Sequence, residues 1–390
     1  MQRLLLLAGM LLCGHEALWA NYQNGGGKDS LPPVETKPGF AGYKPAFAGQ
    51  TRVAGAKTVT PYKVEKIASG LGNPFAIVVM PDSRLMVTLK SGTMEIRDKD
   101  GGLVKKITDL PEVVYAGQGG LLDVVFDPNF TSNRLMYWSY SEKYEGGVVT
   151  AVAKGKLNEI AGKVDNVSVI FRATPATKGN LQFGSRLVFD KKGELYVSVG
   201  EKFAPEIRVQ AQSLSSYLGK IIKIKKDGKP EIVSYGHRNP EGLDINPATG
   251  ELWESEFGPH GGDEINLIRQ GKNYGWPVIS YGLEYSNDKV GNGIQQKAGM
   301  EQPVYYWDPV VSPSGICFYN GTAIPEWKNN LFVACLSGQH VDRLIIRNDR
   351  VVGEERLLTD KKQRFRDVAY ANDILYAITD DGDIYRIVRQ

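Results

Sequence analysis

The sequence predicts an all-β fold, a six-bladed β-propeller with four-stranded blades, over residues 61–390. One pattern recurs six times: an alternating apolar strand, a turn rich in Asp, Pro, Asn or Gly, and a second apolar strand. The copies lie about 45–75 residues apart, which leaves room for four short strands each and is typical of a propeller. Almost no stretch has sustained helical periodicity, which favours the same fold class.

The six copies can be located along the chain by their paired apolar runs. They run from 75–82 into 85–87, 122–128 into 135–138, 186–190 into 195–199, 242–246 into 251–253, 316–319 into 331–333, and 367–370 into 374–378. Further short strands are expected between the copies, at 93–96, 149–153, 219–224, 343–346 and 384–388. No linker interrupts residues 62–390, so we expect one domain; a β-sandwich or two β-domains would fit the regular repeat less well.

The N-terminal 60 residues are expected to lie outside this domain. Residues 1–20 have the pattern of a secretory signal peptide, with Arg3, an apolar core at 4–12 and the small Ala20 at the end. The apolar core is too short to span a bilayer, so we expect a periplasmic or secreted protein without a membrane span. Residues 21–60 are rich in Gly, Pro, Lys and Ser and predict a flexible N-terminal leader.

Charge and cysteine content narrow the range of partners. The net charge of +3 gives no argument for binding to nucleic acid. Cys317 and Cys335 remain after removal of the signal and lie in apolar runs that fit neighbouring antiparallel strands. An oxidising compartment permits a disulfide between them, but we favour two buried free thiols. No spacing of cysteines and histidines resembles a zinc site.

The stretch 235–282 holds the densest mixture of polar groups, glycines and aromatic residues. Arg238 offers a guanidinium group and Asn239 offers an amide. Both groups can donate hydrogen bonds to the oxygen atoms of a planar anionic ligand. The loop at 258–264 contains four Gly or Pro residues followed by Asp263 and Glu264. Irregular loops rich in oxygen donors suit calcium, whereas the alternative is a surface loop with helix-capping acids.

In a propeller the first strand of each blade lines the central channel, so residues at or just before those strands face a ligand at one mouth. The side chains expected at that mouth are Gln118, Gln182, Arg186, Arg238, Asn239 and Arg366.

Six motifs together resemble one family, the soluble quinoprotein sugar dehydrogenases of the glucose/sorbosone and aldose dehydrogenase type. They are GQGGLLD at 117–123, GHRNP at 236–240, GP and GGDE within 258–264, GKNYGWP at 271–277, SPSG at 312–315 and RFRD at 364–367. The resemblance covers about Lys66 to Val388. It implies a propeller that holds pyrroloquinoline quinone and calcium over its axis and oxidises aldose sugars at C1 to lactones. A sugar and an external electron acceptor are then the partners, and a homodimer is compatible with the resemblance.

The resemblance also implies roles for particular residues. The positions that match cofactor contacts are Gln118, Arg238, Asn239, Tyr285, Arg364 and Arg366. Gly258 and Pro259 match carbonyls that hold the calcium of the cofactor, and Glu264 and Tyr274 match ligands of a further calcium. The chemistry of the residues agrees, because three guanidinium groups can neutralise the three carboxylates of the quinone.

Two positions depart from the family pattern. Gln182 stands where the family has its general-base histidine, and Ser337 stands where it has a cofactor-binding lysine. Because an amide cannot accept a proton at neutral pH, another base is needed. We expect Glu201, which matches the acid that orients the missing histidine, to act directly or through water, with His260 as the alternative base. A non-catalytic calcium-stabilised binding propeller and a calcium-dependent lactone hydrolase remain competing interpretations, although the arginines argue against both.

Overall fold

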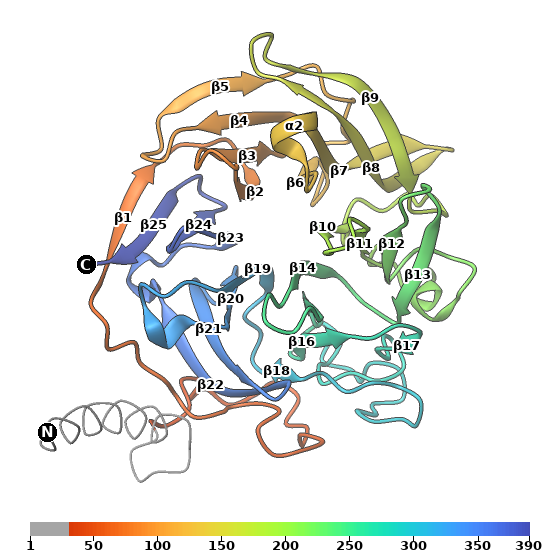
Figure 1. Ribbon diagram of the computed structural model, residues 1–390. Helices are drawn as coiled ribbons and strands as arrows, with labels where there is room; N and C mark the ends of the chain where they lie inside the picture. The colour runs from red at the N-terminus through yellow and green to blue at the C-terminus, as the bar shows by residue number, and fades with distance from the viewer. Residues whose placement is uncertain (1–30) are drawn as a thin grey trace, which may run out of the picture.

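The computed structural model describes residues 31–390, and in this range the chain forms six β-sheets arranged as blades around a central channel (Figure 1). Five sheets have four strands and one has a short fifth strand, so the predicted six-bladed propeller is confirmed. The predicted signal peptide at 1–20 lies outside the described range. No helix within residues 31–390 is both long enough and apolar enough to cross a membrane.

The strands follow one another from the channel outward in each blade. The first blade holds β2 (Pro74–Val79), β3 (Leu85–Leu89), β4 (Thr93–Arg97) and β5 (Leu103–Ile107), and the second holds β6 (Leu121–Phe126), β7 (Leu135–Tyr144), β8 (Gly147–Asn158) and β9 (Lys163–Arg172). The third holds β10 (Gly184–Phe189), β11 (Leu195–Val199), β12 (Lys220–Ile224) and β13 (Pro230–Tyr235), edged by β17 (Lys272–Asn273). The fourth holds β14 (Pro240–Ile245), β15 (Leu252–Glu256), β16 (Asp263–Ile268) and β18 (Tyr305–Trp307).

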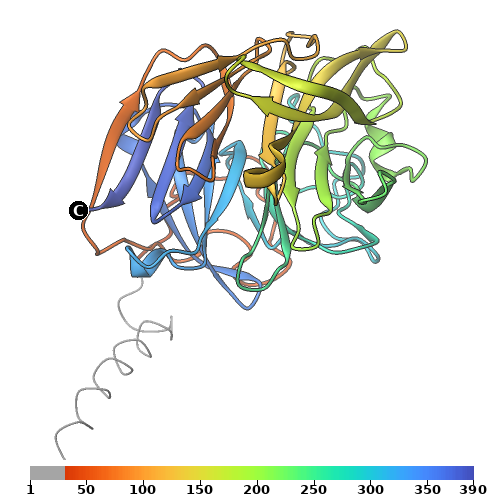
Figure 2. The same ribbon diagram turned by 45° about the horizontal axis from the view of Figure 1, so that its top comes forward.

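The last two blades complete the ring. The fifth holds β19 (Pro313–Tyr319), β20 (Asn330–Cys335), β21 (His340–Arg347) and β22 (Arg350–Leu357), and the sixth holds β23 (Phe365–Ala371), β24 (Ile374–Thr379) and β25 (Ile384–Arg389), with β1 (Tyr62–Ala68) outermost. Strand β1 pairs antiparallel with β25, so that the two ends of the propeller close one blade (Figure 2). The helical segments are short: α2 (Phe130–Asn133), η1 (Arg208–Gln212), η2 (Pro325–Trp327) and η3 (Thr359–Lys361).

Residues 31–60, predicted to be a flexible leader, instead pack against the outer parts of the fourth and fifth blades, past β18 and β22 (Figure 1). The Ala56 amide donates to the Glu354 carbonyl at 2.8 Å, and the buried Gln50 side chain donates to the Pro303 carbonyl at 3.0 Å. Val53 is buried in the apolar core between these blades. The composition did not indicate this, because most of the contacts are polar and depend on partners far away in the sequence.

The inner strands of different blades are joined by charged side chains at the channel. The Arg186 guanidinium on β10 lies 3.5 Å from the Asp123 carboxylate on β6 and 3.1 Å from the Asp367 carboxylate on β23. All three side chains are buried. Each carboxylate also accepts a backbone hydrogen bond from a neighbouring blade, Asp123 from Leu187 and Asp367 from Ile77. The blades are therefore fixed to one another around the axis.

The two cysteines occupy the neighbouring antiparallel strands β19 and β20, as the apolar runs predicted. Both thiols are free and buried, which agrees with the favoured alternative to a disulfide.

We predict that Arg186→Met lowers the free energy of unfolding by about 3–5 kcal/mol, because it leaves two carboxylates buried without their cation. Chemical denaturation measures the loss. Lys63→Met is the matched control, since Lys63 is solvent-exposed and its partner Glu65 is only partly buried, and we expect it to change stability by less than about 1 kcal/mol. A similar effect of both variants would contradict the role given to Arg186.

Candidate cofactor site

The predicted site residues gather at one mouth of the channel because they come at or just before the inner strands. Gln118 precedes β6, Gln182 precedes β10, and Arg238 precedes β14. Arg364 and Arg366 flank the first residue of β23. Hydrogen bonds from Gln182 to Gln118, from Gly184 to Asn239 and from Arg366 to Glu241 show that the starts of these strands meet at one end. A separate cavity of about 500 Å³ is lined by turns that follow β6, β10 and β12, and contains none of the predicted residues.

Two of the three predicted arginines are held by a shared carboxylate. The Arg366 side chain donates to Asp380 at 2.8 Å and to Glu241 at 2.7 Å. Arg364 donates to the second oxygen of Asp380 at 3.0 Å. The Arg364 side chain is 48% exposed and that of Arg366 only 14% exposed. The pair therefore presents positive charge at the mouth from a fixed position.

Hydrogen bonds extend this arrangement across the channel. Asn239 donates to Glu241 at 3.0 Å, and its amide oxygen accepts the Gly184 backbone N–H at 3.1 Å. The Gln182 backbone N–H donates to the Gln118 side chain at 2.6 Å. The residues expected to contact the cofactor are thus linked from the sixth blade through the fourth to the third.

Gln182 itself is strained and incompletely bonded. Its φ is 49°, in the left-handed region that a glutamine rarely adopts. Its side-chain oxygen is buried and has no hydrogen-bond partner among the described residues. An orphaned buried acceptor at a functional mouth is a place where a ligand or water would bind.

Arg238 lies beside a group of aromatic rings. Its guanidinium donates to the Gly258 carbonyl at 2.8 Å and to the Tyr285 hydroxyl at 3.4 Å, while its buried Nε has no partner within the described chain. The Trp276 ring centre lies 5.3 Å from the guanidinium carbon. Tyr285 and Phe203 are 62% and 42% exposed, with ring centres 5.9 Å apart. These rings and the guanidinium offer apolar and cationic surface to a flat anionic ligand.

Glu201 lies directly against Arg238 in this mouth. Its backbone N–H donates to the Arg238 carbonyl at 2.9 Å, and its side chain accepts the Phe203 backbone N–H at 3.1 Å. Burial raises the pKa of Glu201 to about 7, against the opposing charges of Arg238 and Arg208. A carboxyl group with such a pKa is suited to exchange protons at neutral pH.

Lys202 is a buried neighbour that the sequence interpretation missed. Its amine lies 3.2 Å from the ring centre of Phe183 and 3.4 Å from the Thr150 hydroxyl, and no carboxylate of residues 31–390 forms an ion pair with it. Burial lowers the pKa of Lys202 well below its usual value. A single lysine after a strand has no sequence signal that separates it from a solvated lysine, and only the packing identifies this one.

Several of the predicted calcium ligands in the loop at 258–264 and at Tyr274 already form hydrogen bonds within the protein. The Gly258 carbonyl accepts a hydrogen bond from the Arg238 guanidinium, and the Gly258 backbone N–H donates one to the Asp263 carboxylate at 2.7 Å. The Tyr274 hydroxyl is occupied, because it donates to the Leu267 carbonyl at 2.5 Å. A cavity of about 10 Å³, enough for one water-sized particle, is lined by Arg238, Glu256, Gly258, Pro259, Glu264 and Tyr274.

Three glutamates converge behind this cavity, of which only Glu264 was predicted. Glu254, Glu256 and Glu264 all accept from the single side-chain amide of Asn266, at 3.0, 3.2 and 3.1 Å. One oxygen of Glu254 and the side-chain oxygen of Asn266 are buried without a partner in the described structure. Burial raises the pKa of Glu254 and of Glu264 well above the usual value, and the charge of Glu256 adds to it. One amide cannot satisfy this much acceptor capacity.

Two other predicted residues are not joined to the arginines by any hydrogen bond or ion pair of the described chain. Ser337 is exposed on the turn between β20 and β21, and its hydroxyl bonds to that of Ser312 at 2.7 Å. His260, the alternative base, bonds to the Asn287 side chain at 3.0 Å and packs on the Phe40 ring with centres 3.8 Å apart. Neither geometry adds to the arginine and carboxylate network.

The glucose / sorbosone dehydrogenase family model matches residues 71–386. The chain belongs to this family. Its sequence is 38% identical over 344 residues to the aldose sugar dehydrogenase YliI of Escherichia coli (strain K12), covering 83% of this chain and 92% of that protein. It is 26% identical over 406 residues to quinoprotein glucose dehydrogenase B of Acinetobacter calcoaceticus, covering 80% and 84%. The resemblance read from the motifs is thereby confirmed.

Solved structures of aldose sugar dehydrogenases have the same fold as this family member. The apo form of the soluble Escherichia coli enzyme superposes with a TM-score of 0.80 at 37% identity, covering 84% of this chain and 100% of that one. The pyrroloquinoline quinone-bound form of the Streptomyces coelicolor enzyme gives 0.72 at 25% identity, covering 85% and 99%. Quinone-binding homologues of this chain therefore exist.

Proposed function

We propose that this protein is an exported quinoprotein that oxidises aldose sugars at C1 to lactones with pyrroloquinoline quinone and calcium. The observation that carries the proposal is the gathering of Arg238, Arg364 and Arg366 at one mouth, beside the exposed Phe203 and Tyr285 rings. The similarity to dehydrogenases that bind this quinone supports the same assignment.

The residues present fit such a cofactor in charge and in unsatisfied polar atoms. Arg364 and Arg366 form ion pairs with Asp380 and Glu241, whereas the Arg238 guanidinium forms no ion pair with a carboxylate of the described residues. Arg238 is therefore free to pair with an anion. The orphaned Arg238 Nε and Gln182 oxygen are a donor and an acceptor without protein partners in residues 31–390. Arg238, Arg364, Arg366, Gln118, Asn239 and Tyr285 would hold the quinone; Ser337, which replaces the lysine, would add at most a hydrogen bond.

The proposed reaction requires a base from the protein. Bound quinone supplies a two-electron acceptor, and oxidation of the sugar at C1 also releases the proton of the C1 hydroxyl. The Gln182 amide cannot take that proton. Glu201 can take it, because its pKa of about 7 leaves a useful fraction ionised while keeping the carboxylate basic. We therefore assign the base to Glu201, acting directly or through a water held by Gln182.

Calcium is proposed at the three buried glutamates as well as beside the cofactor. Glu254, Glu256 and Glu264 present hard oxygen atoms around the Asn266 amide, and one Glu254 oxygen has no partner in residues 31–390. Glu256 is also bonded to the Arg238 backbone N–H at 2.6 Å. A divalent cation would remove the mutual repulsion of the three carboxylates. Glu264 and Tyr274 line the adjoining cavity. The carbonyls of Gly258 and Pro259 would serve the calcium of the cofactor once Arg238 releases Gly258.

One observation favours a second candidate function. An amide at the base position and a serine at the lysine position are changes expected of a propeller that binds a ligand without turning it over. This alternative is a calcium-stabilised binding protein derived from the same family, and it predicts quinone or sugar binding without reduction of an acceptor.

We predict that the protein, freed of cofactor and supplied with calcium, binds the quinone with saturable quenching of tryptophan fluorescence. Arg366→Met should weaken binding by about 10- to 100-fold, because it removes a charge-assisted contact. Arg134→Met, on the far side of the second blade beside Glu159, is the control and should bind as the wild type does. Absence of saturable binding in the wild type would remove the cofactor and with it the proposed activity.

The pH dependence of dye-coupled sugar oxidation tests the base. With Glu201 as base, the rate of the quinone-loaded enzyme falls about tenfold per pH unit below about 7 and levels off above it, because only the ionised carboxylate accepts a proton. Glu201→Gln should lose about 10²–10⁴-fold in rate while still binding quinone. Unchanged sugar oxidation by Glu201→Gln would exclude Glu201 as the base. If the wild type binds quinone but does not oxidise sugar, the binding-protein alternative is favoured. In that case Gln182→His should raise the rate of oxidation.

Removal of calcium should lower the melting temperature of the quinone-free protein, and added Ca²⁺ should restore it, since the ion binds the folded chain and not the unfolded one. The increase with Ca²⁺ should be lost in Glu254→Gln and retained in Glu65→Gln, a substitution at a partly exposed ion pair in the sixth blade, on β1. If Glu254→Gln keeps the full calcium response, the ion does not bind at the three glutamates.

A further inference from the structure

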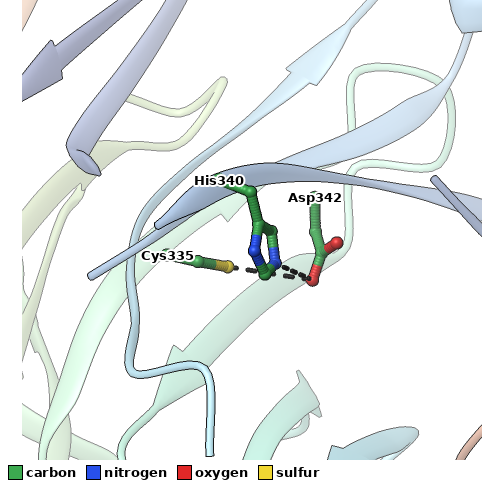
Figure 3. A group of neighbouring side chains, drawn as sticks. All are labelled: Cys335, His340 and Asp342. Atoms are coloured by element: carbon green, nitrogen blue, oxygen red, sulfur yellow. Dashed lines mark hydrogen bonds and ion pairs between the residues drawn. The ribbon is translucent and has the colours of Figure 1, made fainter. Parts of the chain in front are cut away.

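A second cluster of metal-ligating side chains lies in the fifth blade, apart from the arginines. The register of the β20–β21 hairpin places Cys335 directly opposite His340. Asp342 is two residues farther along β21, so its side chain lies on the same face of the sheet as that of His340. Figure 3 shows the thiol, the imidazole and the carboxylate turned toward one point. All three side chains are at most 2% exposed.

The imidazole of His340 is oriented as metal-binding histidines are. Its Nδ1 lies 2.7 Å from the Gly338 carbonyl, which can only accept, so Nδ1 carries the proton. Nε2 then directs a lone pair at the Asp342 carboxylate oxygen, 3.3 Å away, and makes no hydrogen bond within residues 31–390. A lone pair facing a carboxylate at that distance is repelled unless a proton or a metal ion lies between them. Donation from the other ring nitrogen to a backbone carbonyl is the usual orienting contact of a metal ligand.

The distances agree with a tetrahedral ion. The Cys335 sulfur lies 3.7 Å from the same Asp342 oxygen that faces His340, and the three ligand atoms lie within 4.8 Å of one another. Zinc bound to sulfur at about 2.3 Å and to nitrogen and oxygen at about 2.0–2.2 Å places its ligands roughly 3.3–3.7 Å apart. Small movements of the side chains would therefore complete the three-ligand set.

A cavity borders the proposed site on the side of His340. A cavity of about 430 Å³ between residues 35–40 and the fifth blade is lined by His340, Gly338, Ser337 and Arg356. At Gly338 a Cβ atom would come within 2.5 Å of the His340 ring, so only glycine lets the imidazole lie here. Cys335 and Asp342 do not line this cavity, so a water ligand would have to enter past the imidazole.

The nearby charges tolerate a divalent ion. Arg356 Nε lies 3.8 Å from the second oxygen of Asp342, but its guanidinium is also paired with Glu35 at 3.0 Å and Glu354 at 3.4 Å. The charge of Arg356 is thus offset by other acids, and Asp342 keeps one oxygen for an ion.

We propose that Cys335, His340 and Asp342 bind one zinc-class divalent transition metal, with water in the fourth position. Sulfur, imidazole and carboxylate together suit zinc and exclude calcium, which takes oxygen ligands. The ion would tie the two ends of the turn that carries Ser337 and join β20 to β21 at the edge of the cavity. This site is independent of the quinone and of sugar oxidation.

Cobalt titration tests the site directly. The full chain, with metals removed and no quinone added, is titrated with Co²⁺ alone. We expect one equivalent to produce visible d–d bands and a near-ultraviolet thiolate-to-cobalt band, both removed by one equivalent of Zn²⁺. The double variant Cys13→Ser/Cys317→Ser leaves Cys335 as the only thiol of a chain with three cysteines and should keep both bands.

Single substitutions then identify the ligands. Cys335→Ser should abolish the thiolate band, and His340→Gln and Asp342→Asn should each weaken cobalt binding at least tenfold, with folding checked by circular dichroism. A folded wild type without a thiolate band would overturn the proposal, as would an unchanged band in Cys335→Ser. If that variant fails to fold, the spectrum of the double variant decides the matter, because any thiolate band there comes from Cys335.

Discussion

The ion pairs of Arg186 with Asp123 and Asp367 at the axis are the constraint on which the rest of the propeller depends. A propeller closes only if its inner strands keep a fixed separation, and here one buried cation holds acids from two other blades. The guanidinium also donates to the Glu241 carbonyl at 2.6 Å, which adds the fourth blade. Four of the six blades thus meet at a single side chain.

The ion pairs of Arg186 also fix the position of the residues at the mouth of the channel. Glu241, whose backbone is held by Arg186, uses its carboxylate to bind Arg366 and Asn239. The cationic side chains at the mouth are therefore set by the packing of the blades and are in place before a ligand arrives. Such preorganisation reduces the free-energy cost of ordering side chains around an anion.

The repeat and the turn residues were enough to predict the propeller, since each blade carries its own alternation of apolar residues. The sequence could not show that residues 31–60 pack on the blades, because that contact is made by scattered polar groups such as Gln50. Glu254 and Glu256 were missed because their spacing of two residues places them on one face of a polar strand end, which a sequence alone would assign to solvent. Burial of both faces of this strand is a property of the assembled blade.

The sequence predicted the arginines of the cofactor site but not the metal-ligating cluster or Lys202. The arginines stand in compact motifs that resemble a known family, whereas Cys335, His340 and Asp342 have no familiar spacing and meet only through the register of a hairpin. Lys202 likewise differs from a surface lysine only in its packing. Local patterns identify residues that act within one segment, and long-range contacts define the others.

The central claim is that guanidinium groups from distant parts of the chain grip one tricarboxylated quinone at this mouth. A crystal structure of the protein grown with pyrroloquinoline quinone and Ca²⁺ tests it most directly. The account predicts electron density for the flat ring over the channel, with carboxylates within hydrogen-bonding distance of Arg238, Arg364 and Arg366. Density for the quinone elsewhere on the molecule, or a mouth filled only by water at saturating quinone, would contradict it.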